Sequence, residues 1–264
     1  MSTTIYEILF SPTGGTAGVV RALTQGFEGE RRMVERRVVD LMTPAFSSEA
    51  IAFEQTDLCI IAAPVFGGRI PPLAAERIKA LRGNGARAVL VCVYGNRAYE
   101  DALLELQDVA RAAGFRPFAA VTAVAAHSIM KQYAVGRPDA RDKERLGSFG
   151  RQLWEAFLRP DAEQDLSGLP GRRPYKEYRV APMPPLTSAD CLGCRVCVDA
   201  CPAGAIMPGT PRQIDASRCM SCMHCIAVCP QQAGYLDEEK VRALAERLAA
   251  QFAERKECEL FLGK

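Results

Sequence analysis

The sequence lacks three features that would mark particular classes of protein. It has no excess of charge of one sign, because 33 basic residues are balanced by 31 acidic ones, for a formal net charge of +2. Such a balance argues against binding to nucleic acid or a membrane surface through overall charge. No apolar run approaches the roughly 18 residues of a membrane span. The first ten residues have neither a basic segment nor a small-residue cleavage site, so we expect no signal peptide and a cytoplasmic protein.

The composition is otherwise ordinary except for its cysteines. Hydrophobic residues make up 48% and charged residues 24% of the 264-residue chain, as in soluble globular proteins. Eight of the 11 cysteines lie between positions 191 and 229. A disulfide scaffold is typical of small secreted proteins, whereas clustered cysteines in a reducing compartment indicate a metal site. The composition therefore separates a cysteine-poor part of the chain from a cysteine-rich part.

Residues 1–158 alternate between short apolar runs and segments with helical spacing. Predicted strands cover 5–10, 36–41, 58–63, 88–94 and 118–125, and predicted helices cover 16–27, 71–81, 99–113 and 139–158. The third and fourth strands are continuously apolar, as expected of strands buried on both faces of a parallel sheet. Strands separated by helices predict a doubly wound α/β domain.

The remaining chain divides into three parts. Residues 159–185 contain six prolines and two glycines, which disfavour regular structure and predict a linker. Its apolar residues lead us to expect that part of it packs on a domain surface. Residues 186–236 form the cysteine-rich module. Residues 237–264 are predicted to be a C-terminal helix, ending near position 257, and a tail.

The clustered cysteines form two copies of the motif C-x-x-C-x-x-C-x-x-x-C-P. This spacing is typical of bacterial ferredoxins with two [4Fe–4S] clusters, in which the fourth cysteine of each copy serves the other cluster. Three closely spaced thiolates can reach three iron corners of a cubane, while the fourth corner faces away from their loop. We therefore assign cluster one to Cys191, Cys194, Cys197 and Cys229, and cluster two to Cys201, Cys219, Cys222 and Cys225.

Tetrahedral zinc is the alternative, because zinc sites also use paired cysteines. A zinc site needs four ligands and has no use for a repeated triplet followed by Cys-Pro, so we favour iron–sulfur clusters. The module thus resembles a bacterial-type two-cluster ferredoxin, a small α+β domain. His224 lies between two of the predicted ligands, where we expect an exposed loop side chain, with a role in tuning the cluster potential as the alternative. The isolated Cys59 and Cys92 are predicted to be small buried hydrophobic residues.

Loops that follow the strands of a doubly wound sheet are its usual ligand-binding positions. The first of these loops, residues 11–16, reads Ser-Pro-Thr-Gly-Gly-Thr and leads into a helix whose N-terminus can bind an anion. It has neither the Gly-Lys-Ser/Thr ending of a Walker loop nor the spacing of a dinucleotide fingerprint. A phosphate loop in a chain with iron–sulfur motifs suggests a redox nucleotide.

This loop resembles the flavodoxin phosphate loop, S/T-x-T-G-x-T, which Ser11, Thr13, Gly14 and Thr16 match. Gly15 stands where the family often has asparagine. The resemblance implies an FMN cofactor and a five-stranded parallel sheet of order 2-1-3-4-5. It also assigns two later loops to the flavin ring. The expected cofactor-binding residues in those loops are Pro64, Val65, Phe66, Gly67, Gly68, Tyr94, Gly95, Asn96 and Tyr99.

Two aromatic residues and one histidine carry the most specific expectations at this site. Phe66 and Gly67 match the family's aromatic–glycine pair beside the isoalloxazine, and Tyr99 matches a tyrosine that stacks on the outer flavin face. The alternatives are core packing for Phe66 and an ordinary helix-surface position for Tyr99. His127, after the fifth strand, is a candidate proton donor, with a structural role as its alternative.

The whole chain resembles the flavodoxin–ferredoxin fusion proteins of bacteria and archaea. The resemblance implies electron transfer between two [4Fe–4S] clusters and FMN, and our first hypothesis is an oxidoreductase acting on a small molecule or a redox partner protein. The alternatives are a substrate-free electron carrier and a flavin-free redox sensor or docking module. Cover over the flavin, including residues 127–138, would favour the enzyme. The sequence indicates no nucleic-acid partner and sets neither oligomeric state nor direction of electron flow.

Overall fold

The computed structural model describes residues 3–27, 35–159, 166–209 and 212–263. Residues 160–165 of the predicted linker and 210–211 of the cysteine-rich module lie outside this range. The helices are α1 (Gly15–Thr24), α2 (Pro72–Lys79), α3 (Ala102–Ala112), α4 (Ala140–Phe157), α5 (Val196–Asp199), α6 (His224–Ala227) and α7 (Glu238–Leu248), with 3-10 turns η1 (Gln25–Phe27) and η2 (Ala249–Phe252). The strands are β1 (Thr4–Leu9), β2 (Glu35–Asp40), β3 (Leu58–Pro64), β4 (Arg87–Tyr94), β5 (Arg116–Val124), β6 (Leu186–Thr187), β7 (Ile206–Met207), β8 (Gln213–Ile214), β9 (Gly234–Tyr235) and β10 (Glu259–Leu262).

The large sheet has the order β2-β1-β3-β4-β5-β10. Strands β1 to β5 are mutually parallel, which confirms the predicted doubly wound sheet of order 2-1-3-4-5. The prediction of five strands is incomplete, because β10 adds a sixth, antiparallel to β5. This strand is only four residues long and follows a long excursion of the chain, so its partner cannot be inferred from local pattern.

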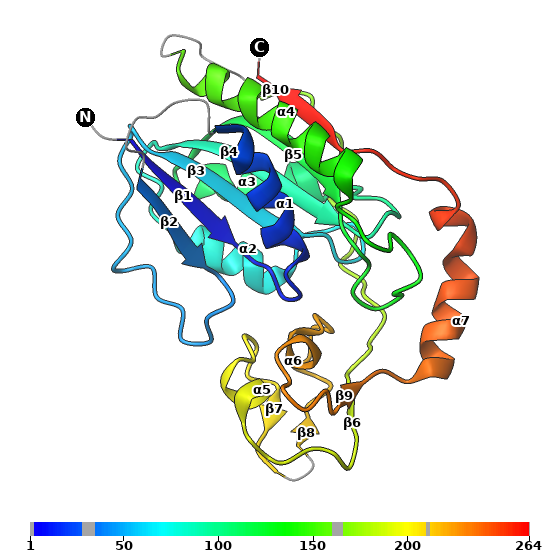
Figure 1. Ribbon diagram of the computed structural model, residues 1–264. Helices are drawn as coiled ribbons and strands as arrows, with labels where there is room; N and C mark the ends of the chain where they lie inside the picture. Colours follow the sequence, from blue (N-terminus) through cyan, green and yellow to red (C-terminus); the bar gives the residue numbers. More distant parts are fainter. Residues whose placement is uncertain (1–2, 28–34, 160–165, 210–211, 264) are drawn as a thin grey trace.

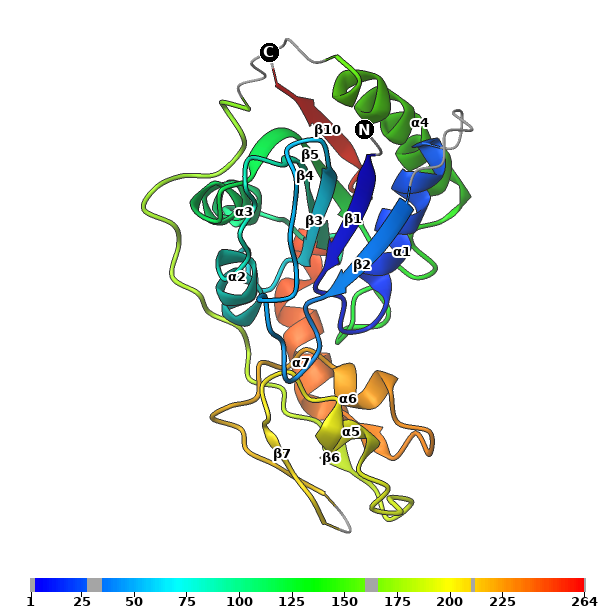
Figure 2. The same cartoon turned by 90° about the vertical axis from the view of Figure 1, so that its left-hand side faces the viewer.

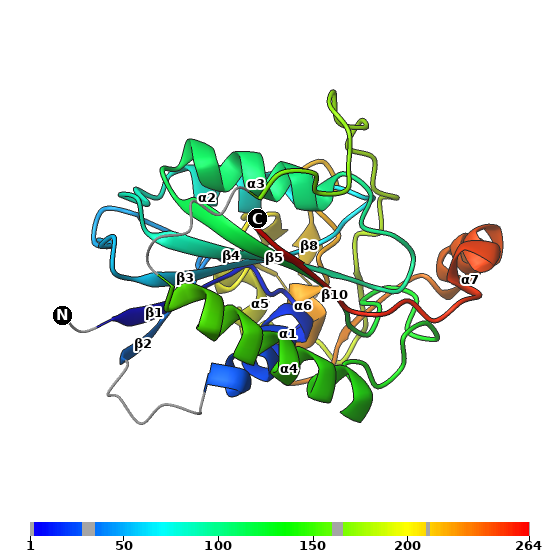
Figure 3. The same cartoon turned by 90° about the horizontal axis from the view of Figure 1, so that it is seen from above.

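Helices α1 and α4 cover one face of the sheet, and α2 and α3 cover the other (Figures 1 and 3). Side chains of β3 alternate between the two cores, as the pleat requires: Ile60 packs on the α1 and α4 side, and Cys59 and Ile61 pack on the α2 and α3 side. Cys59 and Cys92 are fully buried, as the sequence predicts, and burial raises the pKa of both thiols. No helix in the described residues has the length and apolar character that a membrane span requires.

The cysteine-rich module lies beyond the carboxyl ends of the parallel strands (Figures 1 and 2). It contains the short helices α5 and α6 and two small antiparallel ribbons, β6 with β9 and β7 with β8. From this module, α7 leads the chain back to the edge of the large sheet (Figure 1). The module is therefore connected to the α/β domain at both of its ends.

The predicted linker follows the surface of the α/β domain. Leu166 and Leu169 are buried in the core on the α2 and α3 side. The Asp101 carboxylate at the start of α3 accepts hydrogen bonds from the backbone N–H groups of Arg172 (3.0 Å) and Lys176 (2.7 Å). These contacts confirm that part of the segment packs on the domain, and its described portion is a fixed strap rather than a free tether.

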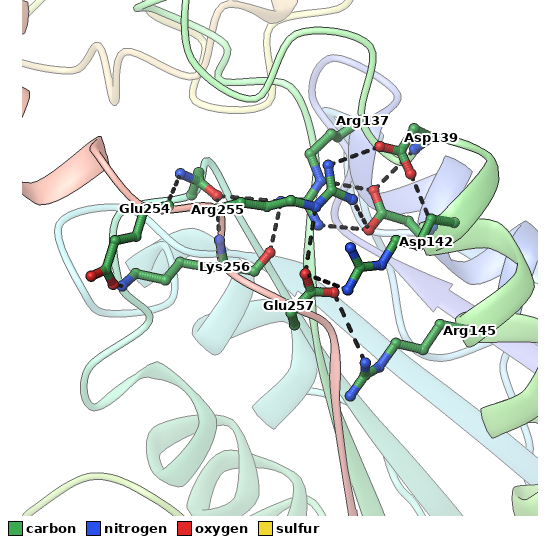
Figure 4. Close-up of polar contacts among 10 residues, drawn as sticks. Arg137, Asp139, Asp142, Arg145, Glu254, Arg255, Lys256 and Glu257 are labelled. Atoms are coloured by element: carbon green, nitrogen blue, oxygen red, sulfur yellow. Dashed lines mark hydrogen bonds and ion pairs between the residues drawn. The ribbon is translucent and has the colours of Figure 1, made fainter.

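A buried ionic network holds the segment between α7 and β10 (Figure 4). The guanidinium of Arg137 donates to both carboxylate oxygens of Asp142, at 2.6 and 2.7 Å, and to the carbonyl oxygen of Lys256 at 2.8 Å. Arg255 donates to Asp142 at 3.0 Å and to Asp139 at 2.9 Å. Asp139 also caps α4 by accepting from the backbone of Asp142. The network therefore joins the start of α4 to the C-terminal segment.

Candidate functional site

A cavity of about 360 Å³ lies where the carboxyl ends of the parallel strands meet the cysteine-rich module. We call it the large cavity to distinguish it from two cysteine-lined cavities of about 20 Å³ each. It is lined by parts of all four loops that follow β1, β3, β4 and β5, and also by the strap, by α7 and by the module. The residues from the strand loops that the sequence predicts as cofactor ligands and that line it are Thr13, Gly15, Thr16, Pro64, Val65, Phe66, Gly67, Tyr94 and Gly95. The sheet topology thus brings three separate predicted loops to one cavity, as expected at a switch point.

The loop after β1 presents the N-terminus of α1 to this cavity. Gly14, a predicted cofactor ligand, adopts a left-handed conformation (φ 84°) at the N-cap and is not among the residues that line the cavity. The Ser11 hydroxyl accepts a hydrogen bond from the backbone N–H of Ala17 at 3.0 Å, so Ser11 caps the helix and does not line the cavity. The remaining free N–H groups, together with the neighbouring Thr13 and Thr16, form a donor set that suits a phosphate.

The loop after β3 is a tight turn between Phe66 and Arg69, whose backbones exchange hydrogen bonds of 2.9 and 3.2 Å. Its centre is Gly67-Gly68, both at positive φ. A Cβ on Gly67 would lie 2.3 Å from the carbonyl oxygen of Arg179, so the strap crosses the turn at a distance that only glycine allows. Gly68 packs against Glu100 and does not line the cavity. Half-buried Phe66 does line it.

Tyr99 and Asn96 do not line the cavity, in contrast to the sequence-based expectation. The Tyr99 hydroxyl donates to Glu259 of β10 at 2.9 Å, and its ring packs edge-on against Tyr94. The Asn96 carboxamide bonds the backbone of the C-terminal segment, including the N–H of Lys256 at 2.9 Å. Both side chains are therefore engaged by β10 and the segment before it, which is the part of the fold that the sequence pattern does not reveal.

His127 lines the cavity and is held in one orientation. Its Nδ1 accepts hydrogen bonds from the backbone N–H groups of Ile129 and Met130, both at 3.1 Å, which leaves the ring proton on Nε2. Burial, and then the positive charge of Arg97, lower the pKa of His127 to about 4. The ring is thus neutral near pH 7. This argues against the proposed role as a proton donor and favours an oriented N–H hydrogen-bond donor.

The lowered pKa of His127 predicts an acid-dependent loss of stability. An unfolded chain protonates this ring below about pH 6.5, whereas the folded chain does so only near pH 4, so stability is lost as pH falls between these values. When the pH falls from 7.5 to 5, the free energy of unfolding of the parent chain should decrease by about 2 kcal/mol more than that of His127→Gln, which lacks the titrating ring. Chemical denaturation at both pH values measures this difference, and parallel losses in the two proteins would contradict the prediction.

Two segments outside the strand loops close the cavity. Lys176, Arg179, Val180 and Ala181 of the strap line one part, and Leu244, Arg247, Leu248, Gln251 and Phe252 of α7 and η2 line another. Phe252 stacks on Tyr133 (centroid distance 4.1 Å) and contacts His127 edge-on. The cavity therefore has a cover made of the strap, the helix α7 and the loop after β5.

The cysteine-rich module has two further small cavities, each lined by four cysteines. Cys191, Cys194, Cys197 and Cys229 line one, and Cys201, Cys219, Cys222 and Cys225 line the other. Each group combines three cysteines of one motif copy with the fourth cysteine of the other copy. Within the described residues, no three or more His, Cys, Asp or Glu side chains converge to hold a single metal ion. A cubane does not require such convergence, because each iron takes one thiolate.

The backbone repeats along with the cysteines. Gly193 and Arg195 have positive φ in the first copy, and Ser221 and Met223 have positive φ at the equivalent positions of the second. Alternation of left- and right-handed residues turns successive N–H groups toward one side, which produces the concave anion sites found at iron–sulfur clusters. The donor chemistry and the local backbone therefore both fit clusters of this kind.

The two cysteine groups differ in electrostatic environment. Burial raises the pKa of Cys222 to about 12 and that of Cys225 to about 11. Backbone N–H groups of Arg212 and Gly193 lower the pKa of Cys191 instead. The surroundings of the group that contains Cys191 thus favour negative charge on sulfur more than those of the group that contains Cys222.

The group that contains Cys222 is the one beside the large cavity, which Ser221 and Cys222 themselves line. His224, the first residue of α6, is not the exposed loop side chain that the sequence predicts, since its Nδ1 donates to the carbonyl oxygen of Pro12 in the phosphate loop at 2.6 Å. Arg77 of α2 donates to the carbonyl oxygen of Pro202 at 3.0 Å. These contacts fix the module against the carboxyl ends of the strands.

Comparison with known proteins finds a family match for one segment of the chain. Residues 190–233 match the family model described as a 4Fe-4S dicluster domain. No curated protein matches the chain.

The structures similar to this chain include three flavodoxins. One from the domain Archaea is 13% identical and aligns with 59% of this chain and 99% of its own, with a TM-score of 0.40. A flavodoxin of Streptococcus pneumonia TIGR4 is 17% identical and aligns with 58% of this chain and 97% of its own, with a TM-score of 0.39. Flavodoxin 1 of Bacillus cereus is 13% identical and aligns with 61% of this chain and 100% of its own, with a TM-score of 0.38.

Strand order and sequence match together identify the two parts. The parallel order 2-1-3-4-5 is the flavodoxin-like doubly wound order. The family match extends over all eight clustered cysteines. The chain therefore combines a domain that has the flavodoxin-like strand order with a segment, residues 190–233, that matches a 4Fe-4S dicluster domain.

Proposed function

We propose that this chain transfers electrons between two [4Fe–4S] clusters and an FMN bound in the large cavity, and that it acts as an oxidoreductase on a small molecule. One observation carries the proposal: the phosphate loop, the flavin loops and the Ser221-Cys222 segment line the same cavity. When bound, the clusters exchange single electrons and FMN exchanges one or two.

The residues of this chain supply binding and orientation. The N-terminus of α1, with Thr13 and Thr16, would hold the FMN phosphate. Phe66 offers an aromatic face to the ring, and the Nε2–H of His127 offers a hydrogen-bond donor of fixed direction. The proposed ligands of cluster one are Cys191, Cys194, Cys197 and Cys229, and those of cluster two are Cys201, Cys219, Cys222 and Cys225.

The cover favours an enzyme over a substrate-free carrier. A carrier exchanges electrons through an exposed flavin edge, whereas an enzyme restricts access and excludes water from its reacting centre. Here the strap, α7 and residues 127–130 all line the cavity. Arg97, Lys176, Arg179 and Arg247 contribute cationic side chains to the lining, which suits an electron-rich flavin or an anionic substrate.

Cofactor analysis of anaerobically purified protein tests the proposal. We expect about one FMN and about eight iron atoms per chain, the number that the two proposed [4Fe–4S] clusters would contain. Phe66→Ala should weaken FMN binding about tenfold through the lost aromatic contact and leave the iron content unchanged. Tyr99→Phe is the matched control, because Tyr99 lies outside the cavity.

Zinc in place of iron, or a chain without flavin, would refute the proposal. Unchanged FMN affinity in Phe66→Ala would show that the ring does not lie against Phe66. In that case the position of the flavin, but not the presence of the cofactors, would be wrong.

A further inference from the structure

Arg212, the residue just before strand β8, is a buried cation with incompletely satisfied hydrogen-bond donors. The residue is 5% exposed, and its Nε and Nη2 atoms have no hydrogen-bond partner among the described residues. Two other buried arginines differ in this respect: Arg77 donates to backbone carbonyls and Arg137 forms a two-point ion pair with Asp142. Burial of an unpaired charge is costly, so such a group indicates a missing anion.

The surroundings of Arg212 show where that anion would lie. The side chain lines the cavity formed by the cluster-one cysteines. Its guanidinium interacts with the thiols of Cys197 and Cys229, and its backbone N–H donates to the sulfur of Cys191. An electrostatic interaction also reaches Cys225, a proposed ligand of cluster two. Arg212 therefore lies between the two cysteine groups, and it lines the cavity of the first group but not that of the second.

The position of the guanidinium is constrained by packing. A Cβ on Gly234 would lie 2.6 Å from Nη2 of Arg212, so strand β9 passes directly beside the side chain. The glycine leaves the space that the guanidinium occupies, and the cation is held among the sulfurs rather than reaching solvent. Arg195 also lines this cavity, but unlike Arg212 it has a side chain that is 58% exposed and pairs with Asp199.

We propose that Arg212 raises the reduction potential of cluster one above that of cluster two. The inference rests on the proposed function, because it requires both clusters. A [4Fe–4S] cluster bound by four thiolates is negatively charged, and reduction adds one further negative charge. A fixed buried cation stabilises the reduced form more than the oxidised form, so it raises the potential. Exposed charges have little effect because solvent screens them.

This asymmetry has a consequence for the path of electrons. Cluster two lies beside the large cavity, since Cys222 lines it, whereas none of the cluster-one cysteines does. The first electron to enter the chain would therefore rest on cluster one, away from the flavin site. An electron would occupy cluster two when a second electron enters the chain, or when the proposed flavin site beside cluster two accepts an electron.

The test is a redox titration of the holoprotein followed by electron paramagnetic resonance. A Cys197→Ala/Cys229→Ala variant, which keeps only cluster two, identifies the midpoint of that cluster. In the parent chain the other midpoint, that of cluster one, should be the higher. In Arg212→Gln the equilibrium constant for reduction of cluster one should fall at least tenfold. For a one-electron couple this lowers the midpoint potential by about 59 mV. The midpoint potential of cluster two should change less.

Two further variants control for charge and for position. Arg212→Lys keeps the cation and should retain most of the cluster-one potential. Arg195→Gln removes an exposed cation from the same cavity wall and should change either equilibrium constant less than twofold. An unshifted cluster-one midpoint in Arg212→Gln, or an equal shift in Arg195→Gln, would overturn the proposal.

The order of reduction in the parent chain decides the matter even if Arg212→Gln fails to assemble a cluster. Reduction of cluster one first supports the proposal, and reduction of cluster two first overturns it. A parent chain that assembles no clusters would instead refute the proposed function, so the two failures are distinguishable.

Discussion

Replacing Asp142 by alanine is expected to reduce the free energy of unfolding by about 3–5 kcal/mol, the usual consequence of removing one partner from a buried ion pair. The Asp142 side chain is 1% exposed and that of Arg137 is 4% exposed. Without the carboxylate, the Arg137 guanidinium would remain buried with only the Lys256 carbonyl and Asn96 as partners. Denaturant unfolding at neutral pH measures the loss.

The same substitution should loosen the C-terminal segment. Asp142 accepts from Arg255, and Arg137 holds the carbonyl of Lys256, so the network fixes the chain just before β10 (Figure 4). We expect faster amide exchange in α7 and β10 than in the parent protein, because both flank this segment. Faster exchange in α7 would indicate a less stable cover over the cavity.

Glu35→Gln is the matched control for the loss of stability. Its ion pair with Arg37 has a similar N–O distance, 2.8 Å, but the two side chains are 58% and 55% exposed. Solvent screens an exposed pair of this kind, so its loss should change stability far less than the loss of Asp142. A loss below about 1 kcal/mol for Asp142→Ala would show that the network does not stabilise the fold as its burial indicates.

The second large expected effect is on the number of clusters that each chain retains. It distinguishes two ways of assigning the eight cysteines to the two clusters. If Cys197 and Cys229 serve the same cluster, the double variant Cys197→Ala/Cys229→Ala loses only that cluster, and about four of eight iron atoms remain. If each motif copy bound its own cluster, the same variant would damage both. The grouping of Cys197 and Cys229 around one cavity supports the first outcome.

Cys197→Ala/Cys201→Ala is the matched control, since both cysteines belong to the first motif copy. Under the proposed sharing, each cluster loses one ligand and neither remains an intact four-iron centre. Iron analysis and electron paramagnetic resonance spectra of the reduced proteins distinguish the cases. One intact cluster in this control, and none in the Cys197/Cys229 variant, would establish the opposite assignment.

Much of the fold is predictable because its signals are local. The continuous apolar run of β3 and the helical spacing of α1 depend on burial within single elements, and both lie where the pattern places them. Strand β10 escapes prediction because a four-residue edge strand has little pattern of its own and pairs with β5 across more than a hundred residues. The buried Cys258 beside it was a local indication that the tail returns to a core.

The candidate site divides in the same way. Phe66 and Thr16 line the cavity because each follows its own strand directly. Tyr99 is turned to Glu259, His224 is bonded to Pro12, and Nδ1 of His127 is occupied by backbone N–H groups. Each outcome depends on a partner that only the folded chain supplies, and no spacing rule names that partner.

By itself the sequence determined the cysteine repeat, the alternation of strands and helices, and the phosphate loop, because these depend on covalent spacing and on burial within single elements. Only the tertiary structure decided that the cluster-two cysteines adjoin the large cavity, that α7 and the strap cover it, and that Arg212 is buried among the cluster-one cysteines. The physical reason is that segments far apart in the chain form the cavity walls and bury the charges. The interactions that result arise only when those segments come into contact.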